Sequence, residues 1–412
     1  MQNIKYLPGL DVLRVFALTA VLLFHLMPGV FRGGYLGVEM FFVLCGFLLT
    51  YILQNLRNIN VPVFYLTKIR QLIPPMLIMI LVTCGALKLL VPESAWGLKG
   101  SSLSMLLNYY NWRQISMSSD YFSSIGAGSP FTHMWTISVQ MQFFLIWPFI
   151  WLWAKKRNRL GQFKAVKRLT IAAAIPAVVM FAVSFMPNTS AFLYYSTVTR
   201  MGSLLLGAAA GIYYKQGSEI TYRLYGFLSR HLVLSLLFWG ANIAAAVFLL
   251  MFADGSNMVI YRGGMALTAV WCAFLVLVAA EYEGNSDSRF IRFCNKISRS
   301  GYEIYLWQYP VIFILNSMLG QTVPVKLLEA AVTFILAFWA VYFLGRIRQI
   351  MSSFVSSRRV KRKRRAVKNI KQEPFDKREY RHNEKDKMAD QHTDDSYMLH
   401  HGDRNTGDRR FS

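Results

Sequence analysis

Long runs of apolar residues constrain the fold of this chain more than any other feature. More than half of its 412 residues are apolar and its mean hydropathy is positive, which excludes an ordinary soluble domain. Helices of about 20 apolar residues cross a bilayer, and ten runs approach that length: residues 10–28, 36–56, 72–92, 133–153, 168–186, 192–214, 231–252, 260–280, 302–319 and 326–345. The sequence therefore predicts an all-α, polytopic membrane protein with about ten transmembrane helices.

The loops between these runs differ in charge from one side of the membrane to the other. The loops on one side carry only scattered cations, whereas those on the other side are basic throughout, at 154–168, 214–230 and 287–299. Lysine and arginine are retained on the cytoplasmic side of a membrane. We therefore expect a multi-pass protein of the cell membrane with its N-terminus and its C-terminus in the cytoplasm.

The chain turns polar and charged after the last run. This change predicts a transmembrane domain at 1–348 and a basic, mostly disordered cytoplasmic tail at 349–412. The KRKRR run at 361–365 would meet the head groups of anionic membrane lipids. A nucleic-acid arm is the other interpretation of such a run, but its place just inside a membrane argues against it, so we expect no nucleic-acid partner.

Ionisable residues interrupt the first two runs. Arg14 and His25 are eleven positions apart, which puts them on one helical face to within about 20°. Glu39 enters the second run from the outer side, at a depth similar to that of His25. Such residues persist in a bilayer where they face a partner or a watery cavity. We expect Glu39 to orient His25 as a general base, although a pair that simply reaches interfacial water fits the same spacing.

Other polar side chains within or beside the runs are candidates for substrate contacts. Lys68 and Arg70, at the start of the third run, suit the phosphates of an anionic cofactor, but they also suit ordinary positive-inside anchors. The outward loop at 91–132 mixes residues that favour either sugar binding or a place at the membrane interface. The remaining candidates are Gln140 and Gln142, Arg200, and the stripe of Tyr302, Tyr305 and Gln308. The four cysteines show no metal spacing, so we expect no metal site.

Five segments together resemble the motifs of acyltransferase family 3, integral-membrane proteins that O-acylate sugars of the cell envelope. The resemblance runs from about Tyr6 to Gly345 and includes LPGLDVLRVFALTAVLLFH, GGYLGVEMFFVLCGFLLT, FYLTKIRQLIPP, HMWTISVQMQFFLIWP and TRMGSLLLGAAAG. Two places depart from the family pattern. The family often has Glu-Glu-Gln where this chain has Gln-Met-Gln at 140–142, and LWH where this chain has LWQ ending at Gln308.

The resemblance implies an O-acyltransferase with no permanently bound cofactor. Its donor substrate would be a cytoplasmic acyl-CoA, most simply acetyl-CoA, and its acceptor a hydroxyl of an extracytoplasmic envelope glycan or glycolipid. Lys68 and Arg70, together with Arg14, would bind the donor's phosphates, and Arg200 would stabilise the developing oxyanion. The implied catalytic residues are His25, Glu39 and Arg14, and the implied substrate-binding residues are Lys68, Arg70, Arg200, Gln140, Tyr305 and Gln308.

Two other functions fit the same sequence. One is a transporter or flippase for a lipid-linked glycan, with the polar stripe as its conduit. The other is a non-catalytic family member within a wall-synthesis complex, since Gln140 and Gln308 carry no proton. Some members of the family append an extracellular esterase-like domain, and the tail of this chain contains no GDS nucleophile motif. We expect an extracytoplasmic partner protein to supply any transfer step that needs such a domain.

Overall fold

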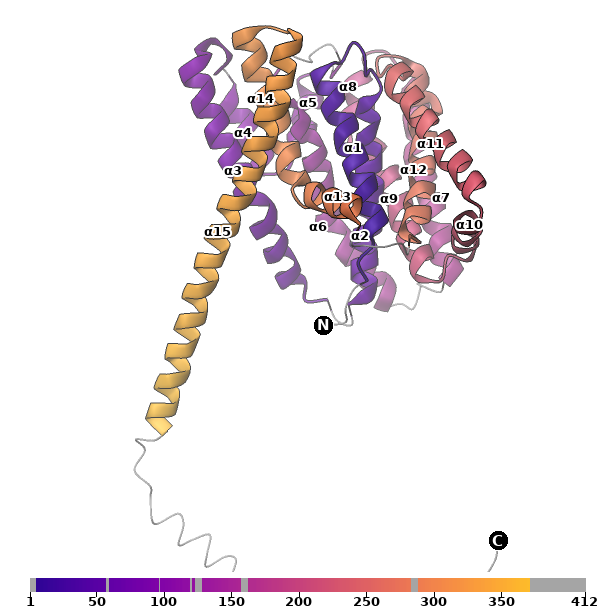
Figure 1. The fold of residues 1–412 in the computed structure, drawn as a ribbon. Coiled ribbons are helices and arrows are strands. Elements are labelled where there is room, and N and C mark those ends of the chain that lie inside the picture. Colours follow the sequence, from indigo (N-terminus) through magenta and orange to yellow (C-terminus); the bar gives the residue numbers. More distant parts are fainter. Residues whose placement is uncertain are drawn as a thin grey trace, which may run out of the picture. The chain divides into compact units, whose positions relative to one another are not determined.

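A computed structural model describes residues 5–56, 59–95, 97–118, 121–122, 128–156, 162–282 and 288–370 (Figure 1). The chain divides into two units, Met1–Leu344 and Gly345–Ser412, and the contacts below all lie within the first. Every regular element of the described ranges is helical, which confirms the all-α class. The α-helices are α1 (Pro8–Leu26), α2 (Gly37–Asn55), α3 (Val61–Leu90), α4 (Leu98–Leu106), α5 (Tyr110–Ser116), α6 (Trp135–Lys156), α7 (Gln162–Val183), α8 (Ser190–Tyr195), α9 (Thr197–Lys215), α10 (Glu219–Arg230), α11 (Leu232–Phe252), α12 (Met265–Ala280), α13 (Arg289–Arg299), α14 (Gly301–Leu319) and α15 (Val323–Ile370).

Eight helical segments of the described chain are long and apolar enough to cross a membrane. They are Pro8–Leu26, Gly34–Asn55, Val61–Leu90, Thr132–Lys156, Lys164–Val183, Leu232–Phe252, Ile260–Ala280 and Val323–Arg346. The other two predicted spans, 192–214 and 302–319, fall mainly on α9 and α14. These helices are rich in buried polar residues, including Arg200, Ser203 and Gln308, which lowers their hydropathy. The predicted count of ten and the cytoplasmic termini stay predictions.

The third span begins earlier than its sequence suggests. The predicted span began at 72, but α3 begins at Val61, where the Asn60 side chain accepts a hydrogen bond from the Val63 amide at 3.1 Å. Such an N-cap satisfies one of the free amides at the start of a helix. Pro74 and Pro75 lie inside α3 rather than at its start. As a result, Lys68 and Arg70 belong to the body of this helix.

The predicted tail begins within α15. This helix continues to Ile370, past the predicted boundary at 348/349, and residues 371–412 lie outside the described residues. The side chains of the basic run at 361–365 are likewise outside the description. The boundary, the disorder of the tail and its contact with anionic lipids therefore stay predictions.

Helices α2 and α9 touch along their backbones. A methyl group added to Gly46 of α2 would lie 2.0 Å from the Leu204 carbonyl oxygen, and one added to Gly207 of α9 would lie 2.0 Å from that of Val43. Small residues allow this close approach between membrane helices. The contact fixes α2 against α9 and thereby sets the distance between the polar side chains near the N-terminal ends of the two helices.

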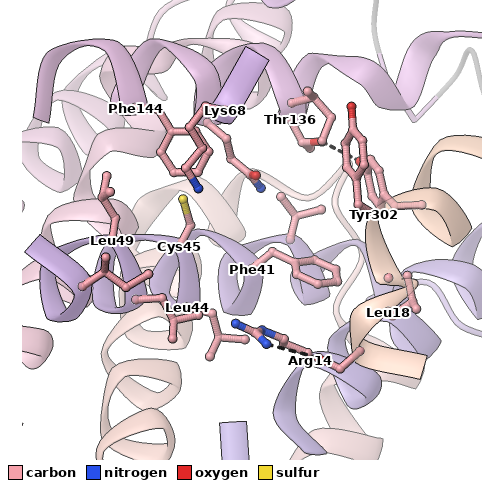
Figure 2. Close-up of a pocket in the computed structure, with 18 residues that line it drawn as sticks. Arg14, Leu18, Phe41, Leu44, Cys45, Leu49, Lys68, Thr136, Phe144 and Tyr302 are labelled. Atoms are coloured by element: carbon pink, nitrogen blue, oxygen red, sulfur yellow. Dashed lines mark hydrogen bonds between the residues drawn. The ribbon is translucent and has the colours of Figure 1, made fainter. Parts of the chain in front are cut away.

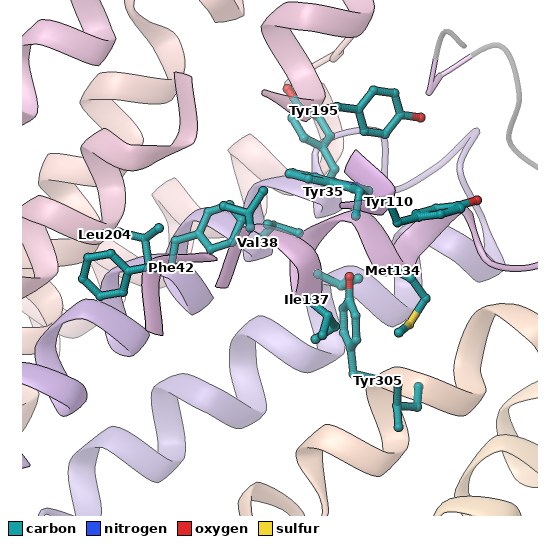
Figure 3. Close-up of a cluster of buried hydrophobic side chains, with 14 of the residues drawn as sticks. Tyr35, Val38, Phe42, Tyr110, Met134, Ile137, Tyr195, Leu204 and Tyr305 are labelled. Carbon is teal, nitrogen blue, oxygen red and sulfur yellow. The ribbon is translucent and has the colours of Figure 1, made fainter. Parts of the chain in front are cut away.

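A cluster of buried aromatic residues fills the end of the bundle at which α2, α6 and α9 begin. Figure 3 shows Tyr35, Tyr110 and Tyr195 among its members, with Tyr305 nearby on α14. Aromatic pairs of this kind add stabilisation beyond the area they bury. Elements from distant parts of the sequence therefore meet in one rigid layer, and this layer surrounds the candidate site.

Replacing Gly207 by alanine is expected to lower the free energy of unfolding by at least about 2 kcal/mol, because overpacking against a backbone atom cannot be relieved by a rotamer change. The measurement is thermal unfolding of the purified protein in detergent. Gly240→Ala in α11, where an added methyl group meets nothing within 4 Å, is the matched control and should unfold like the wild type. A Gly207→Ala protein as stable as its control would contradict the close contact.

Candidate active site

A buried ion pair links α2 to α9. Arg200 Nη1 donates a hydrogen bond to one oxygen of Glu39, and the Ser203 hydroxyl donates to the other. Arg200 Nε also donates to the Tyr194 carbonyl oxygen at 2.7 Å. The side chains of Arg200 and Glu39 are only 2% and 3% exposed. Because each carboxylate oxygen is hydrogen-bonded, the desolvation of this buried charge is compensated.

The guanidinium group of Arg200 also lies against aromatic rings. Its carbon is 4.7 Å from the centre of the Tyr194 ring and 5.3 Å from that of Trp135. Cation–π contacts of this kind are strongest when the cation is desolvated. Within the described residues, Nη2 of Arg200 has no hydrogen-bond partner.

The predicted pair between His25 and Glu39 is wrong. Glu39 uses its two oxygens on α9, whereas His25 Nε2 lies 2.9 Å from the Tyr121 hydroxyl. The physical reason is that the positive charge of Arg200 and the hydroxyl of Ser203 stabilise a buried carboxylate more strongly than a neutral imidazole would. His25 is 3% exposed and lies at the end of α1, as predicted from its spacing.

Tyr121 is the partner of His25 that the sequence did not indicate. It belongs to the outward loop at 91–132 and stacks on Tyr194, with ring centres 4.4 Å apart. Burial raises the pKa of the Tyr121 phenol well above its ordinary value, so this hydroxyl stays protonated. The tautomer of the imidazole determines which of the two groups donates the hydrogen bond between them. Tyr194 thus connects the ion pair to the histidine.

Gln308 lies on the other side of His25. Its amide is fully buried and interacts with the imidazole without reaching hydrogen-bond geometry. The next residue, Tyr309, places its ring centre 4.9 Å from that of His25. The stripe on α14 therefore reaches the histidine at Gln308, a position that the sequence assigned to substrate contact.

His133 is a second buried histidine, and the sequence reasoning missed it. Its Nε2 lies 3.2 Å from the Leu306 carbonyl oxygen, and its ring is 5.6 Å from that of Tyr309, centre to centre. The two histidines thus flank the Tyr309 ring. The signal for His133 was its place at the start of HMWTISVQMQFFLIWP, a segment from which the sequence analysis named only Gln140 and Gln142.

A cavity of about 310 Å³ lies between α1, α2, α3, α6 and α14. Figure 2 shows Lys68, Cys45 and Phe144 pointing toward one another at one side of this cavity, with Arg14 and Tyr302 at others. Lys68 Nζ lies 4.6 Å from the centre of the Phe144 ring. The polar residues that line the cavity are Arg14, Cys45, Lys68, Thr136, Gln140, Ser298, Tyr302 and Tyr305. We refer to this space as the cationic cavity.

Arg14 is held at the cationic cavity by the neighbouring helix α13. Its Nη1 donates to Asp11, one turn earlier in α1, at 2.9 Å and to the Ser298 hydroxyl at 3.2 Å. Asn295 and Ser298 of α13 also donate to the Asp11 carboxylate, at 2.8 Å and 2.7 Å. The guanidinium is about one third exposed, so part of it is available to a ligand.

Arg70 does not share this cavity with Lys68. The two residues are two positions apart, which separates their side chains by about 200° around a helix. Lys68 is half-buried and lines the cavity, whereas Arg70 is exposed on the other face of α3. The structure thus brings together Arg14, Lys68, Gln140 and Tyr305 of the predicted substrate contacts, and it leaves Arg70 apart from them.

A chain of three contacting side chains, Tyr305, His133 and Tyr309, leads from the cationic cavity to His25. The Tyr305 hydroxyl, at the cavity wall, lies 2.6 Å from the Thr136 hydroxyl and 2.9 Å from the His133 carbonyl oxygen. Beyond His133 come the Tyr309 ring and then His25. In the described part of the chain, no group of acidic, histidine and cysteine side chains suits a metal ion.

Comparison with known proteins places these features in a family. The family of the acyltransferase domain, acyltransferase family 3, matches residues 7–346. O-acetyltransferase OatA of Staphylococcus aureus (strain NCTC 8325 / PS 47) is 29% identical over 350 residues, which cover 82% of this chain and 56% of that protein. The putative peptidoglycan O-acetyltransferase YrhL of Bacillus subtilis (strain 168) is 31% identical over 376 residues, covering 87% of this chain and 57% of that protein.

A third relative is the peptidoglycan O-acetyltransferase OatA of Listeria monocytogenes, 29% identical over 351 residues, with 81% of this chain and 54% of that protein covered. The chain thus spans little more than half the length of the curated relatives it matches. No solved structure matches it. The match to the family over most of the chain, together with the eight apolar helices among the described residues, shows that the protein is a multi-pass cell-membrane protein and belongs to acyltransferase family 3.

Proposed function

We propose that the protein is a membrane O-acetyltransferase that moves an acetyl group from cytoplasmic acetyl-CoA to a hydroxyl of an extracytoplasmic cell-wall glycan. The observation that carries this proposal is the chain of contacts that leads from the cationic cavity through Tyr305, His133 and Tyr309 to His25. Relatives named as peptidoglycan O-acetyltransferases support a peptidoglycan acceptor. The basic loops on the side of the N-terminus support a cytoplasmic donor.

The cationic cavity is the donor site in this proposal. Arg14 and Lys68 offer charged donors to the phosphates of coenzyme A, and the apolar wall formed by α2 accommodates its pantetheine arm. The thioester would then lie toward Tyr305 and Thr136, at the wall nearest to His25. Gln140 lines the same cavity and can contact the donor through its amide.

His25 is the general base in this proposal. The Tyr121 hydroxyl now occupies the position at Nε2 from which the acceptor hydroxyl would donate its proton. As the acceptor oxygen bonds to the acetyl carbon, His25 takes the proton and the carbon–sulfur bond breaks, releasing the coenzyme A thiolate. A transient acetyl ester on Tyr302, Tyr305 or Ser138 would divide this transfer into two steps.

Glu39 and Arg200 have a positioning role rather than contact with the reacting atoms. Arg200 binds Glu39 through Nη1 and the carbonyl of Tyr194 through Nε. Only its Nη2 could then play the oxyanion role expected from the sequence. The pair instead holds Tyr194, which stacks on Tyr121 beside His25. The ion pair would therefore affect catalysis indirectly, through the rings of Tyr194 and Tyr121 that connect it to His25.

Replacing His25 by alanine should lower acetylation of the cell-wall glycan by at least about 100-fold, because general-base catalysis contributes that much to a proton transfer. The measurement is mass spectrometry of glycan fragments from a deletion strain that expresses the variant. His231→Ala, an exposed histidine at the start of α11, is the control and should restore acetylation. Wild-type ester content with His25→Ala would rule out the proposed base.

Lys68→Gln should weaken binding of acetyl-CoA to the purified protein by about tenfold or more, since a hydrogen bond to a charged group contributes about 1.5–3 kcal/mol. Arg70→Gln removes the same charge two positions away, outside the cavity, and should change the dissociation constant less than about twofold. Titration calorimetry in detergent measures both. Equal losses in the two variants would mean that the cavity is not the donor site.

Arg200→Met should lower the free energy of unfolding by about 3–5 kcal/mol, because it leaves the Glu39 carboxylate buried without a counter-charge. The double variant Glu39→Gln/Arg200→Met removes both charges and should recover most of that loss while acetylation stays low. Thermal unfolding and glycan analysis report the two effects separately. If the single and double variants unfold alike, the ion pair is not what holds α2 to α9.

A further inference from the structure

Helix α13 has an unusual pattern on its surface. Its sequence begins Arg-Phe-Ile-Arg-Phe, and Ile291 and Cys294 are buried against the bundle. Phe290 and Phe293 are nevertheless 61% and 57% exposed. Two exposed phenylalanines at a spacing of three, each directly after an arginine, describe a helix that lies in a membrane interface with aromatic rings toward lipid.

Helix α10 has the same character. It is too short to span a membrane, and its Ile220, Tyr222 and Phe227 are 74%, 59% and 50% exposed. It ends at the exposed residues Arg230 and His231. Figure 1 shows α13 beside α1 and α10 beside the lower end of α12, so both helices lie at the end of the bundle where α1 begins.

A cavity of about 350 Å³ lies between these two helices and the ends of α1, α11 and α12. Gly9, Leu13 and Val278 form an apolar floor, and Trp239, Tyr282 and Phe290 line its sides. Tryptophan and tyrosine favour the boundary between hydrocarbon and head groups. The cavity therefore has the lining and the depth that suit an acyl chain entering from the bilayer.

Helix α13 carries positive charge next to the residues that line this cavity. Arg289 and Arg292 are exposed and stand on either side of the lining residues Phe290 and Ile291 in the sequence. The neighbouring acidic groups in the described chain have partners of their own: Glu219 pairs with Arg223 at 2.5 Å, Asp11 accepts hydrogen bonds from α13 and Arg14, and Glu281 accepts them from Ser218 and Thr221. Arginines on a helix that lines an apolar cavity complement a phosphate attached to a hydrocarbon chain.

We propose that this cavity binds an anionic phospholipid, with one acyl chain in the cavity and the phosphate at Arg289 and Arg292. The site is separate from the cationic cavity and does not depend on the proposed acetyl transfer. The lipid would join α10 and α13 to the spans α1, α11 and α12. It would thereby stabilise the part of α13 that forms hydrogen bonds to Asp11 and Arg14 of α1.

The test measures lipid retention by the purified protein with native mass spectrometry, after titration with dioleoyl phosphatidylglycerol or dioleoyl phosphatidylcholine. Arg289→Gln/Arg292→Gln removes the two head-group contacts, and Ser235→Phe fills the cavity without changing charge. Lys167→Gln/Arg168→Gln removes two exposed charges from α7, outside this cavity, and is the matched control. Thermal unfolding without lipid confirms that each variant is folded.

The wild type and the α7 control should retain phosphatidylglycerol in preference to phosphatidylcholine. Arg289→Gln/Arg292→Gln should lose at least about tenfold in affinity for phosphatidylglycerol, as expected for two arginine contacts with an anionic head group. Ser235→Phe should lose retention of the lipid altogether. Equal affinity for the two lipids, an equal loss in the α7 control, or unchanged retention by Ser235→Phe would each overturn the proposal.

Discussion

The buried ion pair between Glu39 and Arg200 is the interaction on which the site depends. In a bilayer, two charges can be buried only if each finds a partner, and here α2 supplies the anion while α9 supplies the cation and a hydroxyl. The backbone contact at Gly46 and Gly207 keeps these helices close enough for that pairing. Because Arg200 also holds the Tyr194 carbonyl, the pair determines where the aromatic layer around His25 lies.

In the proposed function, an acetyl group would have to pass from the cationic cavity to the side of His25. Between them lie Tyr305, His133 and Tyr309, which contact one another in that order. Tyr305 is anchored by hydrogen bonds to a hydroxyl and to a carbonyl, both from the segment at the start of α6. A small rotation of this side chain would connect the two sides without opening a continuous aqueous path. Such a layer suits the movement of a neutral acetyl group better than that of a whole glycan.

The sequence predicted the helices well because the length and hydropathy of a run are local properties. It also predicted that polar residues inside the runs gather in the core, as Arg14, His25, Glu39 and Arg200 do. It failed where the answer depends on helix rotation and on distant segments. Spacing within α1 and α2 could not show that Glu39 faces α9, and the nearness of Lys68 and Arg70 in sequence concealed their opposite faces on α3. Tyr121 reaches His25 from a loop with no motif of its own.

The contacts at positions 140, 142 and 308 explain why a glutamine suits each of them. Gln142 donates to the Asn108 carbonyl at 2.8 Å and to the Asn111 side chain at 2.9 Å, which a carboxylate could not do. Gln140 lines the cationic cavity, where its neutral amide adds no negative charge beside Arg14 and Lys68. Gln308 lies beside His25 but cannot accept its proton. In the proposed mechanism, the proton that His25 takes up would therefore leave by another route, and the small cavity that His25 lines together with Asn316 and Lys326 offers one.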